Sequence, residues 1–552
     1  MSVVGKKFIL GASDFDKIMK SNARIVDKTL FIKEFMEDSA EVVCILRPRR
    51  FGKSTNLNML KSFLSIGSDP IRFKEYLIFK EKNFMDQHCG KYPVVFLDLK
   101  DIKGDNWDEM LHEISRFVRK LVASFFTVLN SNMFPSDQLV FDSLTSLTPD
   151  TALVKTALSF LIEQLSNISE QRVIVLVDEY DSPLNHAFQN GFYDKASSFF
   201  GTFYSSALKG NSALEKACLV GIVQVKGAGI LSGLNNFRVY NVAKERYSAF
   251  FGFTKEEIEC FIPDEETLDQ VLNWYNGYWI GSKQMLNPWS FISWVVDKEF
   301  SSYWVETATV EKDFSTLLHG QKQLFTEIFY IIYNGDPLDV SSLNSAVKYS
   351  ETEWSIDGIL HFLVHAGYLT YHKGLNGMGE VFIPNKELHL HWKVDIFPFI
   401  KKKLSSKFSV PLQKAFTAET FEATELQKLM SELIVYPSFH DTAFEISYHN
   451  FFYGIFLGVL QDEKSVQVKS NKESGDGRYD VKVEFQNLKR VFIFEFKKSG
   501  DEDSLEIDAK KALQQIIDKK YSHGSTNYEC HLIGVSFFKK KMSNFEVKTI
   551  YP

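Results

Sequence analysis

The chain has 552 residues, of which 45% are hydrophobic and 24% are charged. This length predicts about three or four domains, and the composition is that of a soluble globular protein, which excludes disorder throughout the chain. The net charge of −7 excludes a uniformly basic nucleic-acid-binding surface, but it leaves room for a local basic channel, because steering depends on how charge is distributed.

Residues 1–245 alternate short apolar runs with longer amphipathic stretches. Near-continuous apolar strands separated by helices predict a parallel sheet covered on both faces, and hence an α/β fold. Such sheets bind ligands at the carboxyl ends of their strands. The predicted strands are Val42–Leu46, Val94–Leu97, Val173–Val177, Leu219–Val223 and, more weakly, Val239–Val242.

A basic loop, residues 47–55, follows the first predicted strand and precedes a predicted helix. It contains Gly52, Lys53 and Ser54 in the arrangement of a phosphate-binding loop, with Arg47 in place of the first glycine of G-x-x-x-x-G-K-[ST]. Lys53 is expected to contact phosphate and Ser54 to ligate Mg²⁺. The expected nucleotide-binding residues of the loop are Arg49, Arg50, Phe51, Gly52, Lys53, Ser54 and Thr55.

The arginines of this loop have several open roles. Arg47, Arg49 and Arg50 can contact phosphate, stabilise transition-state charge, or form structural ion pairs with Asp178, Asp181 or another chain. Loss of the first glycine need not abolish nucleotide binding, because the glycine nearest the phosphate is retained.

Two acidic residues, Asp178 and Glu179, follow the buried strand predicted at Val173–Val177. Asp178 is expected to hold Mg²⁺ through water and also to belong to the nucleotide site, whereas Glu179 can orient and deprotonate the attacking water. A phosphate loop and a distant acidic strand together predict a P-loop NTPase.

The sequence predicts two further regions in the middle of the chain. Residues 246–300 predict a small helical lid, because Thr254 and Glu257 form a capping box and Asn287 can cap a helix. Residues 301–410 predict a winged-helix-like region, in which a helix is followed by a glycine and two strands. We expect this region to be a packing domain rather than a DNA reader.

Residues 411–552 predict a second α/β unit, with a helix at Glu445–Leu460, strands at Tyr479–Phe485 and Val491–Lys497, a helix at Asp508–Lys520 and a strand at His531–Phe537. A hairpin of the first two strands would bring Asp480, Glu495 and Lys497 together. Two carboxylates bind Mg²⁺ or Mn²⁺, and a nearby lysine can position a metal-polarised water. This D-x₁₄-E-x-K spacing is that of the PD-(D/E)XK nuclease superfamily.

Further candidate residues surround this second site. Glu445, a candidate metal ligand, and His449 lie at i and i+4 of one predicted helix, so both can face the metal. Gln515 falls on the helix after the second strand. For His449 the alternative is a satisfied, half-buried histidine.

The whole chain resembles AAA-ATPase-like proteins with a C-terminal PD-(D/E)XK nuclease domain, a restriction-endonuclease-like α/β fold. The resemblance implies an ATP- and Mg²⁺-dependent ATPase joined to a nuclease, and it makes the arginine-rich loop typical. One departure is Val223–Lys226 after the fourth strand, where relatives carry polar or basic residues; Gln224 is expected to sense the γ-phosphate. The matching segments are Val26–Thr29, Arg47–Ser54, Asp178–Pro183, Gly233–Asn236, Asn287–Ser290, Pro384–Glu387, Gly477–Asp480 and Glu495–Lys497.

Two hypotheses follow. In the first, the ATPase controls a metal-dependent nuclease acting on DNA or RNA, with a homo-oligomer as a further expectation. In the second, the protein is a non-catalytic ATP-dependent switch or scaffold, and the nuclease fold serves only for binding.

The sequence predicts an intracellular protein, cytoplasmic or nuclear, without membrane contact. This prediction rests on five scattered cysteines, an N-terminus without a signal-peptide pattern and the lack of an 18-residue apolar run.

Overall fold

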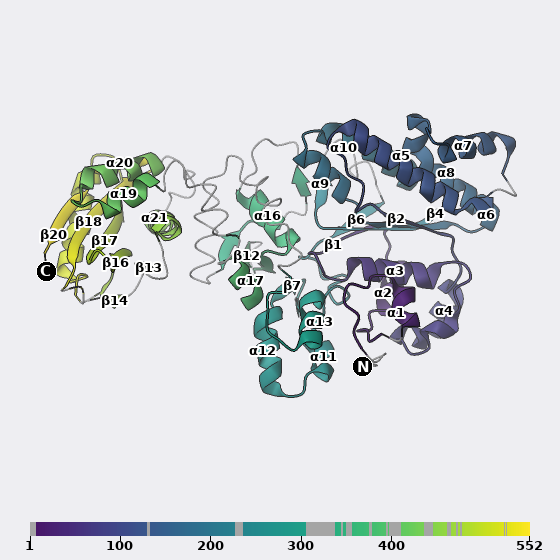
Figure 1. The fold of residues 1–552 in the computed structure, drawn as a ribbon, viewed down its shortest axis with the longest axis horizontal. Helices are drawn as coiled ribbons and strands as arrows, with labels where there is room; N and C mark the ends of the chain where they lie inside the picture. Colours follow the sequence, from purple (N-terminus) through teal and green to yellow (C-terminus); the bar gives the residue numbers. More distant parts are fainter. Residues whose placement is uncertain are drawn as a thin grey trace. The chain divides into compact units, whose positions relative to one another are not determined.

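The structure is a computed structural model, shown in Figure 1. It describes residues 7–21, 23–129, 133–226, 236–304, 337–343, 346–348, 356–374, 378–392, 396, 410–434, 445–460, 465–470, 473–474, 477–523, 525 and 527–551. The chain forms two compact units, one of residues 1–308 and 339–388 and one of residues 309–338 and 389–552. The four domains drawn from the sequence, with boundaries at residues 245, 300 and 410, stay a prediction.

A five-stranded parallel sheet forms the centre of the first unit and confirms the predicted fold class. Its order is β2-β3-β4-β1-β6, so β4 separates the strand before the basic loop from the strand before the two acids. The strands are β1 Val42–Leu46, β2 Val94–Asp98, β3 Val173–Asp178, β4 Leu214–Gly221 and β6 Phe237–Tyr240. Every residue of β1 and β3 is buried, as expected for apolar strands covered on both faces.

Helices cover both faces of this sheet (Figure 1). One face carries α3 Lys53–Leu64 together with α1 Phe15–Lys20, α2 Leu30–Met36 and α4 Lys82–His88. The other carries α5 Trp107–Ser124, α8 Thr151–Ser169, α9 Ser182–Gln189 and α10 Tyr193–Leu208, with α6 Phe126–Leu129 and α7 Pro135–Thr145 near the end of this layer. Both faces of the sheet are therefore removed from water, which explains the near-continuous apolar strands.

Residues 246–300, predicted as a lid and called the lid below, contribute most of an apolar core around Ile258, Val271 and Phe291. The lid contains α11 Lys255–Ile258, α12 Glu265–Tyr275 and α13 Pro288–Asp297, and the capping box of Thr254 and the Asn287 cap are both present. The sequence did not predict the short hairpin β7 Tyr278–Ile280 and β8 Lys283–Met285. Three-residue strands are too short to show an alternating pattern.

In the middle region a helix is followed by a hairpin, as predicted. The helix α16 Ile356–Ala366 stops at Gly367, whose φ of +95° lies in the left-handed region. The antiparallel strands β11 Thr370–Lys373 and β12 Gly379–Phe382 pair with β9 Leu338–Val340 in one sheet, and α17 Lys386–His391 follows. The strand β10 Ala346–Lys348 pairs in parallel with β5 Gln224–Lys226.

The second unit holds a mixed sheet of order β13-β16-β17-β18-β19, with β20 also pairing to β18. One face packs on α19 Val410–Thr417, α20 Ala423–Leu433 and α21 Glu445–Leu460, and the other packs on α22 Leu505–Asp518. The strands are β13 Val466–Ser470, β16 Val481–Phe485, β17 Arg490–Lys498, β18 Glu529–Phe538, β19 Lys541–Met542 and β20 Glu546–Ile550, beside a short pair β14 Glu473–Ser474 and β15 Gly477–Arg478. Across the described parts of both units, no helix is long and apolar enough to cross a bilayer.

Candidate functional site

The basic loop turns sharply between β1 and α3. Arg50 and Gly52 both have left-handed backbones, with φ of 67° and 79°. This conformation costs a glycine little but strains an arginine. The helix α3 starts at Lys53, so its first backbone N–H groups lie at the end of the loop, where they can bind an anion.

A cavity of about 440 Å³ joins this loop to the acidic strand end. Its size is within the usual range for a small-molecule site. The lining includes six of the loop residues predicted to bind nucleotide, namely Arg49, Arg50, Gly52, Lys53, Ser54 and Thr55, and also Glu179 and Asp181. The structure therefore brings the two distant motifs into one site.

Lys53 is buried and turned back onto its own loop. Its Nζ donates to the carbonyl oxygens of Arg47 at 3.1 Å and Pro48 at 2.8 Å. Burial lowers the pKa of Lys53, and the negative charges of Glu179 and Asp178 oppose that shift. To contact a phosphate, Lys53 must exchange two carbonyl acceptors for phosphate oxygens, which are stronger acceptors for an ammonium group.

The acid pair lies at the end of β3. Burial raises the pKa of Asp178, and the neighbouring Ser54 side chain opposes this shift. Burial also raises the pKa of Glu179, against the attraction of Lys53. A raised pKa makes Glu179 a stronger base. Ser54 and Asp178 supply the oxygen donors that suit Mg²⁺ held at a phosphate site.

Asp181 supports the loop after β4. Its Oδ2 accepts the backbone N–H groups of Ile222 and Val223, both at 2.9 Å. A Cβ on Gly221 would come within 2.5 Å of the Asp181 carboxylate, so glycine is required for this close approach. Asp181 therefore orders the strand end that faces the phosphate loop.

Arg47 has a structural position rather than a place in the cavity. Its side chain is fully buried, and the guanidinium donates to the carbonyl oxygens of Leu46 at 2.8 Å, Tyr240 at 2.9 Å and Tyr247 at 3.2 Å. It also lies 5.3 Å from the Phe251 ring centre. Of the roles left open for this residue, the structure favours the structural one, with carbonyl groups in place of carboxylates.

Replacing Arg47 by glycine, which restores the usual loop residue, is expected to destabilise the protein. Arg47→Gly leaves three buried carbonyl groups without their donor, and we expect the free energy of unfolding to fall by about 3 kcal/mol. Urea denaturation of the nucleotide-free protein measures this. The control Arg50→Gly relieves a left-handed arginine and should change stability by less than about 1 kcal/mol; equal effects of the two variants would contradict the assignment.

The remaining predicted nucleotide residues are placed as follows. The guanidinium of Arg50 lies 4.5 Å from the Trp289 ring centre, so it joins the loop to the lid. Burial lowers the pKa of Arg50, with Glu179 opposing. Gln224 begins β5, opposite Ala346 of β10, and the described cavity lining ends before it at Ile222. Its role as a γ-phosphate sensor stays a prediction.

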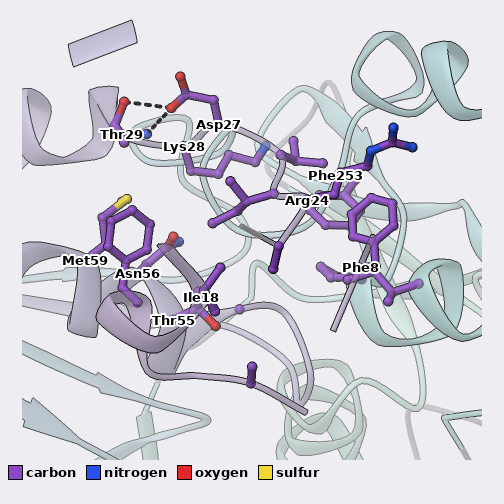
Figure 2. Close-up of a pocket in the computed structure, with 18 of the residues that line it drawn as sticks. Phe8, Ile18, Arg24, Asp27, Lys28, Thr29, Thr55, Asn56, Met59 and Phe253 are labelled. Carbon is purple, nitrogen blue, oxygen red and sulfur yellow. Dashed lines mark hydrogen bonds between the residues drawn. The ribbon is translucent and has the colours of Figure 1, made fainter. Parts of the chain in front are cut away.

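Sequence reasoning missed a second, smaller pocket beside the first, drawn in Figure 2. It has a volume of about 110 Å³ and a mainly apolar wall that includes Phe8, Phe51, Met59 and Phe253. Gly52 and Thr55 line both pockets, so the small pocket is next to the phosphate loop. The segment Val26–Thr29, one of the matching segments in the sequence, also lines this pocket.

The second predicted site is also assembled. In the ladder, Val481 is opposite Phe494, which places Asp480 beside Glu495. The Asp480 carboxylate accepts the N–H of Phe496 at 2.7 Å. Glu495 is 3% exposed, accepts a hydrogen bond from Gln515, and lies 3.7 Å from the ammonium of Lys497.

Two carboxylates on neighbouring strands are the donor set of a Mg²⁺ ion that keeps water and substrate oxygens as its other ligands. Among the residues that the structure describes, no group of three or more His, Cys, Asp and Glu side chains is gathered for a metal. The side chain of Glu445 lies outside the described residues, so its predicted role as a ligand stays a prediction.

His449 of α21 is buried, at 3% exposure. Burial lowers the pKa of His449 to about 4, and its Nε2 is 2.6 Å from the Ser470 hydroxyl. Tyr479 packs with Val491 and Ile493 on the α22 side of the sheet, whereas Val481 belongs to the core on the other face. The strand β16 begins at Val481, so the strict alternation does not extend back to Tyr479.

Two family models match parts of this chain. Residues 9–231 match the family model described as a predicted AAA-ATPase, and residues 443–546 match that of the PD-(D/E)XK nuclease superfamily. The chain carries an AAA-ATPase-like domain and a nuclease-superfamily domain. Both motifs of the first site lie within the ATPase match, and Asp480, Glu495 and Lys497 lie within the nuclease match.

Two individual relatives complete the comparison. This chain is 25% identical to an uncharacterized protein in the vnfD 5′ region of Azotobacter chroococcum mcd 1, and the alignment covers 98% of both chains. A Walker-type ATPase of Pyrococcus abyssi matches in structure with a TM-score of 0.36 and 13% identity, over 67% of this chain and 96% of that one.

Proposed function

We propose that the protein binds and hydrolyses ATP with Mg²⁺, and that its nucleotide state controls a metal-dependent nuclease acting on DNA or RNA. The observation that carries the proposal is the shared cavity of the phosphate loop and the acidic strand end. Loop, metal donors and base are the parts that phosphoryl transfer to water requires.

In the ATPase domain, Lys53 and the first N–H groups of α3 would bind the phosphates. Ser54 and Asp178 would hold Mg²⁺, which neutralises charge on the phosphates when bound. Glu179 would take a proton from the attacking water. The small apolar pocket would take the nucleobase, because it adjoins the loop and offers a mainly apolar wall.

In the nuclease domain, Asp480 and Glu495 would hold a Mg²⁺ or Mn²⁺ ion, with Glu445 as a further proposed ligand. The metal would polarise a water for attack on a phosphodiester. Lys497 lies 3.7 Å from Glu495, where it would position that water or stabilise charge on the phosphate. Control by nucleotide, and a homo-oligomer in which a neighbouring arginine completes the ATP site, belong to the proposal.

Nucleotide binding tests the first half of the proposal. Lys53→Ala should weaken Mg²⁺-ATP binding roughly 100-fold, because it removes a charged hydrogen-bond donor to the phosphates. Titration with fluorescently labelled ATP measures the affinity. The control Lys61→Ala removes a lysine from the far end of the same helix and should leave the affinity unchanged. Equal ATP affinity in wild type and Lys53→Ala would refute the site.

The competing proposal is an ATP-dependent switch or scaffold that does not hydrolyse ATP and uses the nuclease fold only for binding. One observation favours it: at this strand end the described cavity lining includes Gly221 and Ile222 but not Gln224. This proposal predicts tight ATP binding with no phosphate release.

A further inference from the structure

The segment Val26–Thr29, hereafter the strap, has side chains that alternate between two parts of the ATPase unit. Val26 belongs to the apolar core of the lid, with Ile258 and Phe291. Asp27 and Thr29 instead contact the 3₁₀ helix Leu77–Lys80. The strap therefore bridges the lid and the body of the ATPase domain.

The contacts to the body are hydrogen bonds that strap side chains accept from backbone N–H groups. Asp27 Oδ2 accepts the N–H of Leu77 at 2.6 Å, and Thr29 Oγ1 accepts the N–H of Ile78 at 3.1 Å. Asp27 Oδ1 also accepts from the backbone and hydroxyl of Thr29, at 2.9 and 2.6 Å. These bonds hold two donors of the 3₁₀ helix that lack partners within it, so this side of the strap is fixed.

The contact to the lid is a buried ion pair. Lys28 is 7% exposed, and its ammonium donates to Glu257 at 2.6 and 2.7 Å and to the carbonyl oxygen of Ala249 at 2.6 Å. Glu257 is the same residue that closes the capping box of α11 with Thr254. Lys28 therefore holds the first helix of the lid at its N-terminus.

The strap also forms one wall of the small apolar pocket. All four of its residues line that pocket, opposite Met59 and Asn56 of α3 and beside Phe253 of the lid. Figure 2 shows Asp27 bonded to Thr29 on one side and Lys28 extending away from them toward Phe253. Separation of Lys28 from Glu257 would open the pocket on its lid side.

We propose that the strap fastens the lid over the nucleobase pocket, with Lys28–Glu257 as the releasable contact and Lys28 as a positioning residue for nucleotide retention. An ion pair suits this role, because water solvates both charges when the lid opens and offsets the lost attraction. An apolar contact would gain no favourable solvation when the lid opens. The ligand named here rests on the proposed function of the neighbouring phosphate site.

A measurement without nucleotide tests the fastening alone. Hydrogen exchange of the full-length protein should show about tenfold faster exchange in α11 and α12 for Lys28→Met than for wild type, because the cost of opening the lid falls. Lys33→Met is a matched control, since Lys33 pairs with Glu81 at 2.7 Å in the same domain and neither residue lines the pocket. Unchanged exchange in the lid of Lys28→Met would overturn the proposal.

Nucleotide dissociation tests the consequence. We expect fluorescently labelled ADP to dissociate about tenfold faster from Lys28→Met, because a lid that opens more often releases its ligand faster. Tripolyphosphate, which has no base, should bind both proteins equally. Equally weakened binding of ADP and tripolyphosphate would place the effect in the phosphate loop and overturn the proposed role of the strap. An unchanged ADP dissociation rate would also overturn it.

A second variant and a wild-type reference keep the two proposals separate. Glu257→Gln keeps the shape of the side chain and should show the same faster exchange of the lid and faster ADP dissociation. It can therefore replace Lys28→Met in the test if that variant does not fold. Wild type that binds neither ADP nor tripolyphosphate would refute the proposed nucleotide site, while the exchange measurement would still decide whether the strap fastens the lid.

Discussion

Glu179→Gln is expected to abolish ATP turnover while ATP binding remains. Glutamine keeps the size of the side chain but cannot accept the proton of the attacking water. General-base catalysis of this kind contributes roughly 10²–10⁴-fold to a rate, so phosphate release should fall by about 10³-fold. Phosphate release under saturating Mg²⁺-ATP measures the rate, and labelled-ATP titration measures the affinity.

The matched control for this variant is Glu170→Gln. Glu170 is exposed and has a left-handed φ of 53°, close to the 51° of Glu179. The control therefore measures the effect of a Glu-to-Gln substitution in this backbone conformation outside the nucleotide site. Its turnover should equal that of wild type. A wild-type rate that is already negligible and does not change in Glu179→Gln would favour the switch proposal.

The same assignment predicts the direction of the pH dependence. Burial raises the pKa of Glu179 above its ordinary value of 4.5. A base works only when deprotonated, so turnover should fall as the pH drops through this raised pKa, at a higher pH than for an exposed glutamate.

Glu495→Gln is expected to abolish metal-dependent cleavage of nucleic acid. The substitution removes one of two carboxylate ligands but keeps an oxygen next to Gln515, so the strand β17 should stay in place. Loss of a ligand charge weakens metal binding and the polarisation of the attacking water. We expect cleavage of labelled DNA or RNA with Mg²⁺ or Mn²⁺ to fall by at least about 100-fold.

The control for the nuclease site is Glu484→Gln on the neighbouring strand. Glu484 is partly buried and lies 3.5 Å from Lys482, so it tests loss of a carboxylate in the same sheet but outside the pair. Its cleavage rate should match wild type. Background cleavage that is the same in wild type and Glu495→Gln, on both DNA and RNA, would refute the nuclease proposal.

The partners of Arg47 could not be predicted from the sequence. Its position in the loop suggested phosphate or an acidic partner, because guanidinium groups most often bind anions. The structure gives it three carbonyl acceptors, from Leu46 and from the chain near Tyr240 and Tyr247. Tyr240 and Tyr247 lie 193 and 200 residues away in sequence, and backbone carbonyl groups leave no sequence signal, so only the folded chain identifies them.

The small pocket could not be predicted from the sequence either. Its walls come from the N-terminal segment, α3 and the lid, and each contributes ordinary apolar residues. Apolar residues predict burial but not the space left between them. The segment Val26–Thr29 was visible as a motif, yet its bridging role depends on Glu257, which the sequence shows only as part of a capping box.

The chemistry of both sites was determined by the sequence alone, because it depends on residue type and on positions relative to strand ends. An apolar strand followed by Gly52-Lys53-Ser54, another followed by Asp178-Glu179, and the spacing of Asp480, Glu495 and Lys497 each predict a local geometry that short-range backbone rules enforce. Only the tertiary structure decided how the first two motifs share a cavity, that Arg47 supports the loop, and that Lys28 reaches the lid. Those features depend on contacts between distant segments, which the packing of the whole domain selects.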